Sequence, residues 1–172
     1  MAKNLILYYS RRGENYVNGG VENLAKGNTE IVAEFVQKAV CGDLFRIETV
    51  KPYAKDYYQC IEEAKQELRA QARPKLKDER TELSTYDNIF VLGPCWWGTY
   101  PMAMYTQLEK LDFAGKRVFL LMTHEGSGMG QSEGAMKKLM KGARFGKSLA
   151  VHGADAAQSE GLVAGWARNC VA

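Results

Sequence analysis

The sequence predicts one α/β domain over residues 1–172, in which a parallel sheet of five strands lies between helices on both faces. Two observations predict this class. Short, continuous apolar runs alternate along the chain with longer segments whose apolar residues recur at helical spacing. Continuous runs of this length are typical of strands that are buried on both faces, as in a parallel sheet between two layers of helices.

The individual elements follow in chain order. Continuous apolar runs predict strands at residues 5–9, 44–50, 89–92, 117–122 and 145–151. Helical spacing predicts helices at residues 30–40, 57–72, 102–111, 132–140 and 159–168. We interpret Asn28-Thr29 as the N-cap signal of the first helix. Residues 16–27 are predicted to be irregular, because they are about twice as long as the usual connection between a strand and a helix. Residues 16–26 within them are expected to act as a mobile flap outside the core.

Composition and charge exclude several classes of protein. Hydrophobic residues make up 46% of the chain and charged residues 25%, which is typical of a globular protein. No segment approaches the roughly 18 apolar residues of a membrane span, and the apolar run near the start is too short for a signal peptide. We therefore expect a cytoplasmic protein with no membrane partner. The net charge of +3 is too small to favour nucleic-acid binding.

The cysteines do not indicate a metal or redox site. Cys41, Cys60, Cys95 and Cys170 are far apart in the sequence, form no CxxC pair and are accompanied by only two histidines. We expect no metal site and interpret the cysteines as buried or half-buried free thiols.

The loops after the three most apolar strands are the places to look for a ligand, because open α/β sheets bind ligands at the carboxyl ends of their strands. The first of these loops is Ser10-Arg11-Arg12-Gly13-Glu14-Asn15, and Gly27-Asn28-Thr29 follows at the start of a helix. Hydroxyls, an amide and the free N–H groups of a helix N-terminus are able to hold a phosphate. The alternative is a plain turn followed by a helix cap.

The loop at residues 123–130 contains glycines at positions 126, 128 and 130. This GxGxG pattern is not the GxGxxG of a dinucleotide site, it follows a late strand, and the sequence contains no GxxxxGK[ST] motif. We interpret it as a loop whose backbone comes close to a flat ligand, with simple turn flexibility as the alternative.

Two of the three tryptophans stand in the remaining loop, GPCWWGTYP at residues 93–101. Tryptophan normally goes to a core and a loop rich in Gly and Pro normally goes to the surface, so an adjacent pair here suggests an aromatic platform. An anion site in one loop, a platform in the next and close backbone in the third together predict a site for a planar, phosphorylated ring.

The loops SRRGENY, PCWWGTYP and THEGSG resemble those of the flavodoxins and flavodoxin-like proteins. The resemblance implies a three-layer sandwich with strand order 2-1-3-4-5, FMN as cofactor and electron transfer as the function. The flavin would cycle between oxidised, semiquinone and hydroquinone states. The partners that it implies are redox proteins, namely a reductase and an electron acceptor.

The resemblance also assigns roles to residues. It places the phosphate at Ser10, Arg12, Asn15, Asn28 and Thr29. It places the isoalloxazine at Pro94, Trp96, Trp97, Gly98 and Thr99, and the pyrimidine edge at Thr123, Glu125, Gly126, Ser127 and Gly128. Residues 16–26 depart from the family, whose phosphate loop runs directly into its helix, and the near-neutral charge departs from the usual acidic flavodoxin.

Several alternatives stay open at this point. An NAD(P)H-dependent quinone or flavin reductase of the same fold is one, and a flavin-free interaction module is another. Within the site, stacking needs only one ring on a face, so we expect Trp97 to stack and Trp96 to pack into the core. His124 is either a proton donor or a structural hydrogen bonder.

Overall fold

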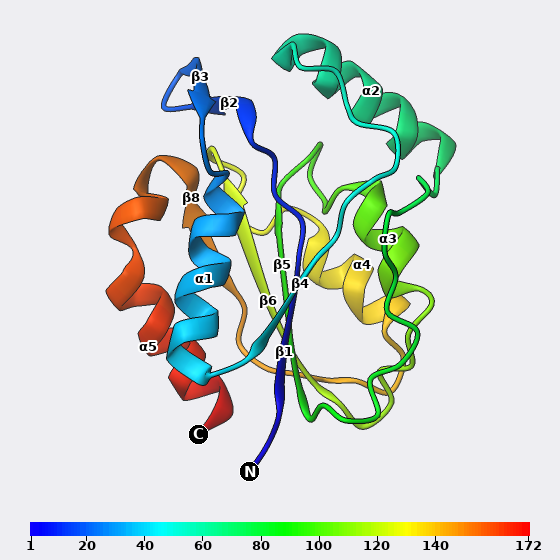
Figure 1. Ribbon diagram of the computed structural model, residues 1–172, viewed down its shortest axis with the longest axis vertical. Helices are drawn as coiled ribbons and strands as arrows, with labels where there is room; N and C mark the ends of the chain where they lie inside the picture. The colour runs from blue at the N-terminus through cyan, green and yellow to red at the C-terminus, as the bar shows by residue number, and fades with distance from the viewer.

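The computed structural model describes residues 1–172 and shows a sheet with helices on both faces (Figure 1). The strands of the main sheet are β1 (Asn4–Tyr8), β4 (Asp43–Arg46), β5 (Asn88–Pro94), β6 (Arg117–His124), β7 (Arg144–Phe145) and β8 (Leu149–His152). Their order is β4-β1-β5-β6, with β7 and β8 both pairing with β6, and every pair is parallel. The predicted order 2-1-3-4-5 is confirmed.

The fifth strand is broken into two pieces. β7 pairs with Arg117 and Val118, whereas β8 pairs with β6 from Leu121 onward. Between the two pieces Gly146 passes against the ring of Phe119, so closely that a Cβ would collide with the ring. At this point the chain stops pairing with β6, because it passes around the Phe119 ring. The prediction of a single strand at residues 145–151 is therefore wrong in detail.

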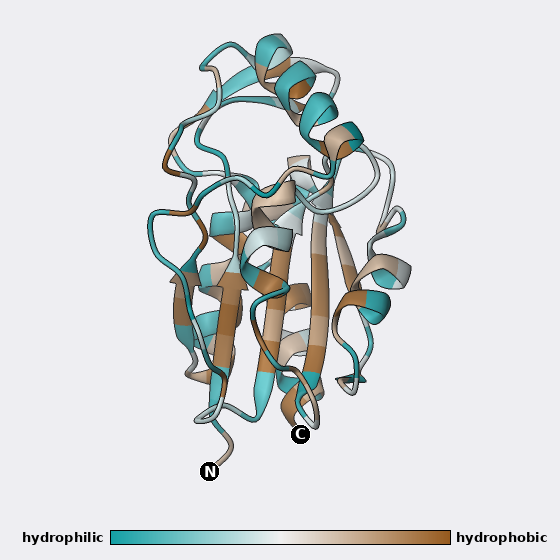
Figure 2. Ribbon diagram, turned by 90° about the vertical axis from the view of Figure 1, so that its right-hand side faces the viewer, coloured by the Kyte–Doolittle hydropathy of each residue, from teal (hydrophilic) through white to brown (hydrophobic).

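Four helices cover the sheet, two on each face. They are α1 (Asn28–Val40), α3 (Met102–Leu108), α4 (Ser132–Leu139) and α5 (Glu160–Val171), the last preceded by the short 3₁₀ helix η1 (Gly153–Gln158). Strand residues alternate between two cores, as the pleat requires. Ile6 and Phe90 pack with residues of α1 and α5, and Leu7 and Val91 pack with residues of α3 and α4. Figure 2 shows the resulting apolar strands between more polar outer surfaces.

The remaining helix, α2 (Tyr57–Ala70), lies across the carboxyl edge of the sheet instead of on a face (Figures 1 and 2). Only Cys60 and Ala64 are buried on it, which explains why its sequence is so polar. Asp56 caps it through its carboxylate, which accepts the N–H of Gln59 at 2.9 Å. The helix thus forms a cover above the ends of the strands.

The segment predicted to be irregular is a β-hairpin, so the predicted conformation is wrong, while its mobility stays a prediction. β2 (Gly13–Val17) and β3 (Gly20–Leu24) pair antiparallel, and Asn18 and Gly19 form the turn between them with φ of +54° and +92°. Asn-Gly between β-forming residues is a strong hairpin signal, because both central residues of a type I′ turn need positive φ. The hairpin lies beside α2 at the same edge of the sheet.

Other differences from the sequence predictions are at element ends. The strand predicted at residues 44–50 ends at Arg46, and the helix predicted at residues 102–111 ends at Leu108. Cys60 and Cys170 are buried and Cys95 is half-buried, as expected, but Cys41 is exposed where α1 ends in a left-handed residue. None of the helices is long and apolar enough to cross a membrane.

Candidate functional site

A pocket of about 280 Å³ opens at the carboxyl edge, where β1, β5 and β6 end. The loops after these strands and the start of α1 form its base, and α2 and the hairpin form its roof. This is the edge at which ligands bind in open α/β sheets. Nine of the fifteen residues expected at the site line the pocket: Ser10, Asn15, Asn28, Thr29, Pro94, Trp96, Trp97, Thr123 and Glu125.

The start of α1 faces this pocket with its N–H groups. The N-cap is Gly27, not Asn28-Thr29, and no side chain of the segment itself caps the helix. Ser10, two residues after β1, caps the helix instead, because its Oγ accepts the N–H of Glu30 at 3.0 Å. A Cβ on Gly27 would collide with Ser10 and with the backbone of Arg11, so glycine is needed for the two segments to meet. The N–H groups of Asn28 and Thr29 have no acceptor within the helix, which makes this end suitable for an anion.

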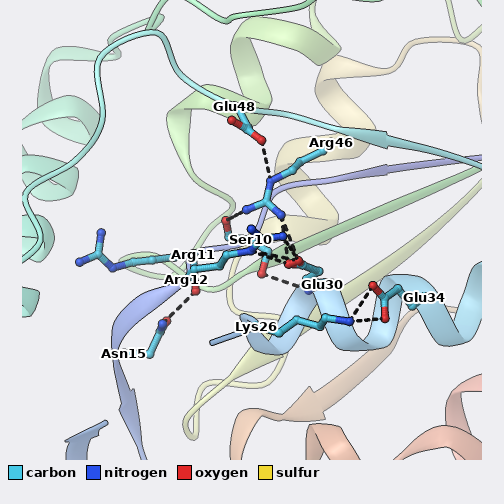
Figure 3. Close-up of polar contacts among 9 residues, drawn as sticks. All are labelled: Ser10, Arg11, Arg12, Asn15, Lys26, Glu30, Glu34, Arg46 and Glu48. Atoms are coloured by element: carbon cyan, nitrogen blue, oxygen red, sulfur yellow. Dashed lines mark hydrogen bonds and ion pairs between the residues drawn. The ribbon is translucent and has the colours of Figure 1, made fainter. Parts of the chain in front are cut away.

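Arg12 does not line the pocket, contrary to expectation. Its guanidinium pairs with the carboxylate of Glu30 at 2.8 Å, and Arg46 of β4 pairs with the same carboxylate at 3.1 Å (Figure 3). The Glu30 side chain is only 3% exposed. The hydrogen bond from Arg12, aided by the bonds and charge of Arg46, holds the pKa of Glu30 below its usual value. Arg12 therefore balances a buried charge at the base of the first loop.

Asn15 reaches the pocket but also holds its own loop in shape. Its amide nitrogen donates to the carbonyl oxygens of Arg11 and Gly13 at 2.9 and 3.1 Å. Figure 3 shows Asn15 and Arg11 on the hairpin side of the loop, away from the Glu30 cluster.

Trp97 stands at the mouth of the pocket in a left-handed conformation, with φ of +57°, and Gly98 follows with φ of +86°. Trp97 is 48% exposed to solvent. Its indole N–H donates to the carbonyl of Ile61 in α2 at 2.8 Å. The ammonium of Lys65 lies 5.2 Å from the ring centroid. The ring is thus held between the loop and the roof.

Trp96 lies deeper than Trp97. Its ring packs edge-on against Tyr9 and Tyr53, at centroid distances of 5.2 and 5.1 Å, and it still contributes to the wall of the pocket. Thr99 points elsewhere, because its hydroxyl shares a 2.7 Å hydrogen bond with Tyr105 of α3. Gly98 does not line the pocket, and its carbonyl accepts the N–H of Gln131 at 2.7 Å.

The end of β6 and the loop after it reach the pocket through Thr123, His124 and Glu125. The hydroxyl of Thr123 shares a 2.8 Å hydrogen bond with that of Thr29, which joins the end of β6 to α1. The carboxylate of Glu125 lies 3.2 Å from Nε2 of His152 and accepts the N–H of Asn18 at 3.1 Å. The expected residues Gly126, Ser127 and Gly128 lie outside the pocket.

His124 also lines the pocket. Its Nδ1 accepts the N–H of Gly126 at 2.9 Å, which leaves the proton of the neutral ring on Nε2. Burial, reinforced by the nearby His152, lowers the pKa of His124. The neutral ring is therefore a hydrogen-bond donor at neutral pH, as well as a structural part of its own loop.

Seven lining residues were not among the fifteen expected, namely Arg11, Tyr16, Tyr57, Ile61, Cys95, His124 and Gly153. Three of them, Tyr16, Tyr57 and Ile61, belong to the roof. Tyr16 of the hairpin and Tyr57 of α2 stack on each other, with ring centroids 6.0 Å apart and an angle of 28° between planes. The Asn-Gly turn was the signal that could have revealed the hairpin, but nothing local marks α2 as a roof helix apart from its polarity.

The roof is tied together by polar contacts. Arg11 donates to the carbonyl oxygens of Glu14, Ala54 and Lys55, each at 2.9 Å. The Glu14 carboxylate accepts the N–H of Tyr57 at 2.6 Å, at the first residue of α2. A carboxylate at this position also complements the positive end of the helix. The hairpin thus holds the start of α2 over the pocket.

A family model described as flavodoxin matches residues 22–169 of the chain. The comparison with curated proteins found no match.

Solved structures share the fold over nearly the whole chain. A candidate flavoprotein from Bacteroides uniformis is 28% identical with a TM-score of 0.76, over 96% of this chain and 97% of that protein. Another from Bacteroides eggerthii is 25% identical with a TM-score of 0.77, over 100% and 99% of the two chains. A flavoprotein from Lactobacillus acidophilus, crystallised in complex with FMN, is 18% identical with a TM-score of 0.66, over 92% and 98%.

Proposed function

The chain belongs to the flavodoxin family, and on this basis we propose that it is an electron-transfer protein with FMN as its cofactor. The observation that carries the proposal is the pairing of two features in one pocket. The N–H groups at the start of α1 and Ser10 lie together at the base of the pocket, and Trp97 stands at the mouth of the pocket. The first suits a phosphate and the second suits a flat ring.

The base of the pocket fits the phosphate of FMN. Ser10, Asn28 and Thr29 supply hydroxyl, amide and backbone N–H donors, and no lysine is needed. Gly153 lets the chain after β8 lie close to Glu125 and Asn28, since a Cβ at this position would collide with both side chains. Glu125 lies 3.2 Å from Nε2 of His152 and accepts the N–H of Asn18.

The upper part of the pocket fits the isoalloxazine ring. Trp97 and Trp96 come from one side and the Tyr16–Tyr57 pair comes from the roof. When bound, FMN supplies the redox chemistry, since its ring takes up one or two electrons. The aromatic walls and the roof keep water from the ring, so that negative charge on it is poorly solvated. We therefore expect a low potential for the second electron.

The proposed partners are proteins that deliver and accept electrons, namely a reductase and an electron acceptor. With a net charge of +3, the chain would not rely on the strongly acidic surface that a typical flavodoxin presents to basic partners. Its partner surfaces are accordingly expected to be neutral or acidic.

The test begins with the absorbance spectrum of purified protein and titration with FMN and riboflavin. We expect bound flavin, and much weaker binding of riboflavin, because it lacks the dianion that gains charge-assisted hydrogen bonds at the start of α1. Equal affinities would refute the phosphate assignment, and no flavin binding at all would favour the flavin-free module.

A reductase of the same fold is the second candidate, because the roof supplies an aromatic wall against which a flat substrate could lie. Steady-state oxidation of NAD(P)H with quinones as acceptors distinguishes the two. A carrier needs a separate reductase and shows little turnover alone, whereas a reductase turns over without one.

A further inference from the structure

A second cavity, of about 680 Å³, lies beside the cofactor pocket on the side of β4. The first loop, β3, the end of β4 and the segment that leads to α2 form its walls. It shares only Ser10 and Arg11 with the cofactor pocket. Its volume is in the range of small-molecule sites, which span roughly 300–1,000 Å³. Nothing in the proposed electron-transfer function requires this cavity.

The walls of the second cavity are strongly cationic. Two carboxylates, those of Glu14 and Glu48, line it. Five cationic side chains also line it: Arg11, Arg12, Arg46, Lys55 and Lys77.

The nearby carboxylates do not balance these cations. Glu48 is shared between Arg46 at 3.0 Å and Lys77 at 3.1 Å. Glu30, buried behind the wall, is shared between Arg12 and Arg46 (Figure 3). Three cations therefore face two carboxylates, which leaves an excess of positive charge even in the paired part of the wall.

Arg11 and Lys55 add to this excess because neither has a carboxylate partner. Arg11 donates only to backbone carbonyl oxygens, and Figure 3 shows it pointing away from the Glu30 cluster. Lys55 forms no ion pair with any acidic residue. The carboxylate of Glu14 is directed instead to the N–H of Tyr57 at the start of α2. The cavity is thus arranged to receive an anion of more than one charge.

We propose that the second cavity binds the phosphate groups of a nucleotide. Guanidinium and ammonium groups are the usual partners of phosphate, and the surplus cations match a dianion or trianion. The cavity is too large for inorganic phosphate alone, and Asn23, Pro52 and Tyr53 offer an amide, an apolar ring and a phenol ring to the rest of the ligand. Because Arg11 lines both cavities, the nucleotide would lie next to the phosphate end of the cofactor pocket.

The experiment titrates the FMN-loaded protein with pyrophosphate, ADP and adenosine by calorimetry at constant ionic strength. We expect pyrophosphate and ADP to bind saturably and adenosine not to bind. Replacing the two cavity lysines in the variant Lys55→Gln/Lys77→Gln is expected to weaken ADP binding by about tenfold, since two charge-assisted contacts are lost. Lys110→Gln is the matched control, because Lys110 pairs with Glu79 and lines neither cavity.

Three results would overturn the proposal. The first is ADP affinity that the double lysine variant leaves unchanged. The second is adenosine binding as tight as that of ADP. The third is release of flavin by ADP, seen as a rise in free-flavin fluorescence, since the anion would then occupy the cofactor's own phosphate site. Flavin binding is measured separately, so these results do not depend on the proposed electron-transfer role.

Discussion

The indole N–H of Trp97 lies 2.8 Å from the backbone carbonyl of Ile61, and this hydrogen bond joins the loop after β5 to the roof helix α2. The ammonium of Lys65, one turn further along α2, lies 5.2 Å from the centroid of the same ring. The orientation of Trp97 is therefore set by the roof as well as by its own loop. The ring and the roof should respond together when either is changed.

The first prediction concerns Trp97 as the stacking platform. Trp97→Ala should weaken binding of oxidised FMN by roughly 1–3 kcal/mol, a size taken from base–aromatic stacking. Trp97→Phe keeps a ring but loses the bond to Ile61, so we expect a smaller loss. Fluorescence titration of flavin measures both. Normal FMN binding by Trp97→Ala would identify Trp96 as the platform instead.

The second prediction concerns the Trp97–Gly98 peptide. Gly98 has φ of +86°, and a Cβ there would meet nothing within 4 Å, so a substitution acts through the backbone alone. The Gly98 carbonyl is held by Gln131, which confines any rotation to the Trp97–Gly98 peptide. If that peptide turns on reduction to present a carbonyl to N5–H of the flavin, Gly98→Val should raise the cost of a positive φ by about 1–3 kcal/mol.

That cost corresponds to a change of one to two decades in the separation of the two one-electron steps, at about 1.4 kcal/mol per decade. Because Gly98 already has a positive φ before reduction, part of the cost falls on the resting loop, so affinity for oxidised FMN is measured beside the potentials. Redox titration of Gly98→Val beside the parent measures the gap between the two potentials. An unchanged gap would refute the peptide-turn mechanism.

Periodicity was sufficient to predict the sheet and the four helices that pack on it, because each buries one regular face. Phe90 and Val91, for example, alternate between the two cores just as a strand buried on both faces requires. The same information could not place α2, which buries only Cys60 and Ala64 and takes its position from contacts with the hairpin. Its role depends on long-range contacts that no local pattern encodes.

The site was predicted in part for a similar reason. Residues at or shortly after the end of a strand, such as Ser10, Trp97 and Thr123, reach the pocket because the strand end fixes their place. Arg12 and Thr99 do not reach the pocket. Arg12 pairs with Glu30, and the hydroxyl of Thr99 shares a hydrogen bond with that of Tyr105. Side-chain partners of this kind are decided by tertiary packing.

The third prediction concerns the buried carboxylate of Glu30. Its pKa is lowered in the folded protein by Arg12 and Arg46, so the stability that it contributes is present above its ordinary pKa of 4.5 and is lost as the pH falls through the folded value. Glu30→Gln should lower the free energy of unfolding at pH 7 by about 1–3 kcal/mol. The difference from the parent should shrink only as the pH falls below 4.5. Chemical denaturation across the acid range measures it.

Glu34→Gln is the control for this change, since Glu34 stands on the same helix and pairs with Lys26 on the surface. We expect its effect to stay within about 0.5 kcal/mol. A loss of the same size in both variants would show that the two-arginine arrangement around Glu30 adds nothing.

The fourth prediction concerns the hairpin. Joining Asn15 directly to Glu22 through an Asn-Gly turn removes its tip, and the two residues are already paired across the ladder. Because the hairpin forms its own two-stranded sheet, the main core should unfold cooperatively as before. FMN affinity should fall, since Tyr16 and the bond from Asn18 to Glu125 are lost. Loss of cooperative unfolding would instead show that the hairpin is part of the core.

The last prediction concerns Tyr57, which reaches the pocket from α2 while its neighbour Tyr58 is 64% exposed and does not line it. If Tyr57 forms the roof side of the ring site, Tyr57→Ala should weaken FMN binding by about 1 kcal/mol or more through the lost aromatic contact, and Tyr57→Phe should bind as the parent does. Tyr58→Ala supplies the matched control on the same turn of the helix. Each affinity comes from flavin fluorescence titration, with circular dichroism to check that α2 is retained. Equal losses in Tyr57→Ala and Tyr58→Ala would mean that the roof acts through helix packing and that the ring does not contact Tyr57.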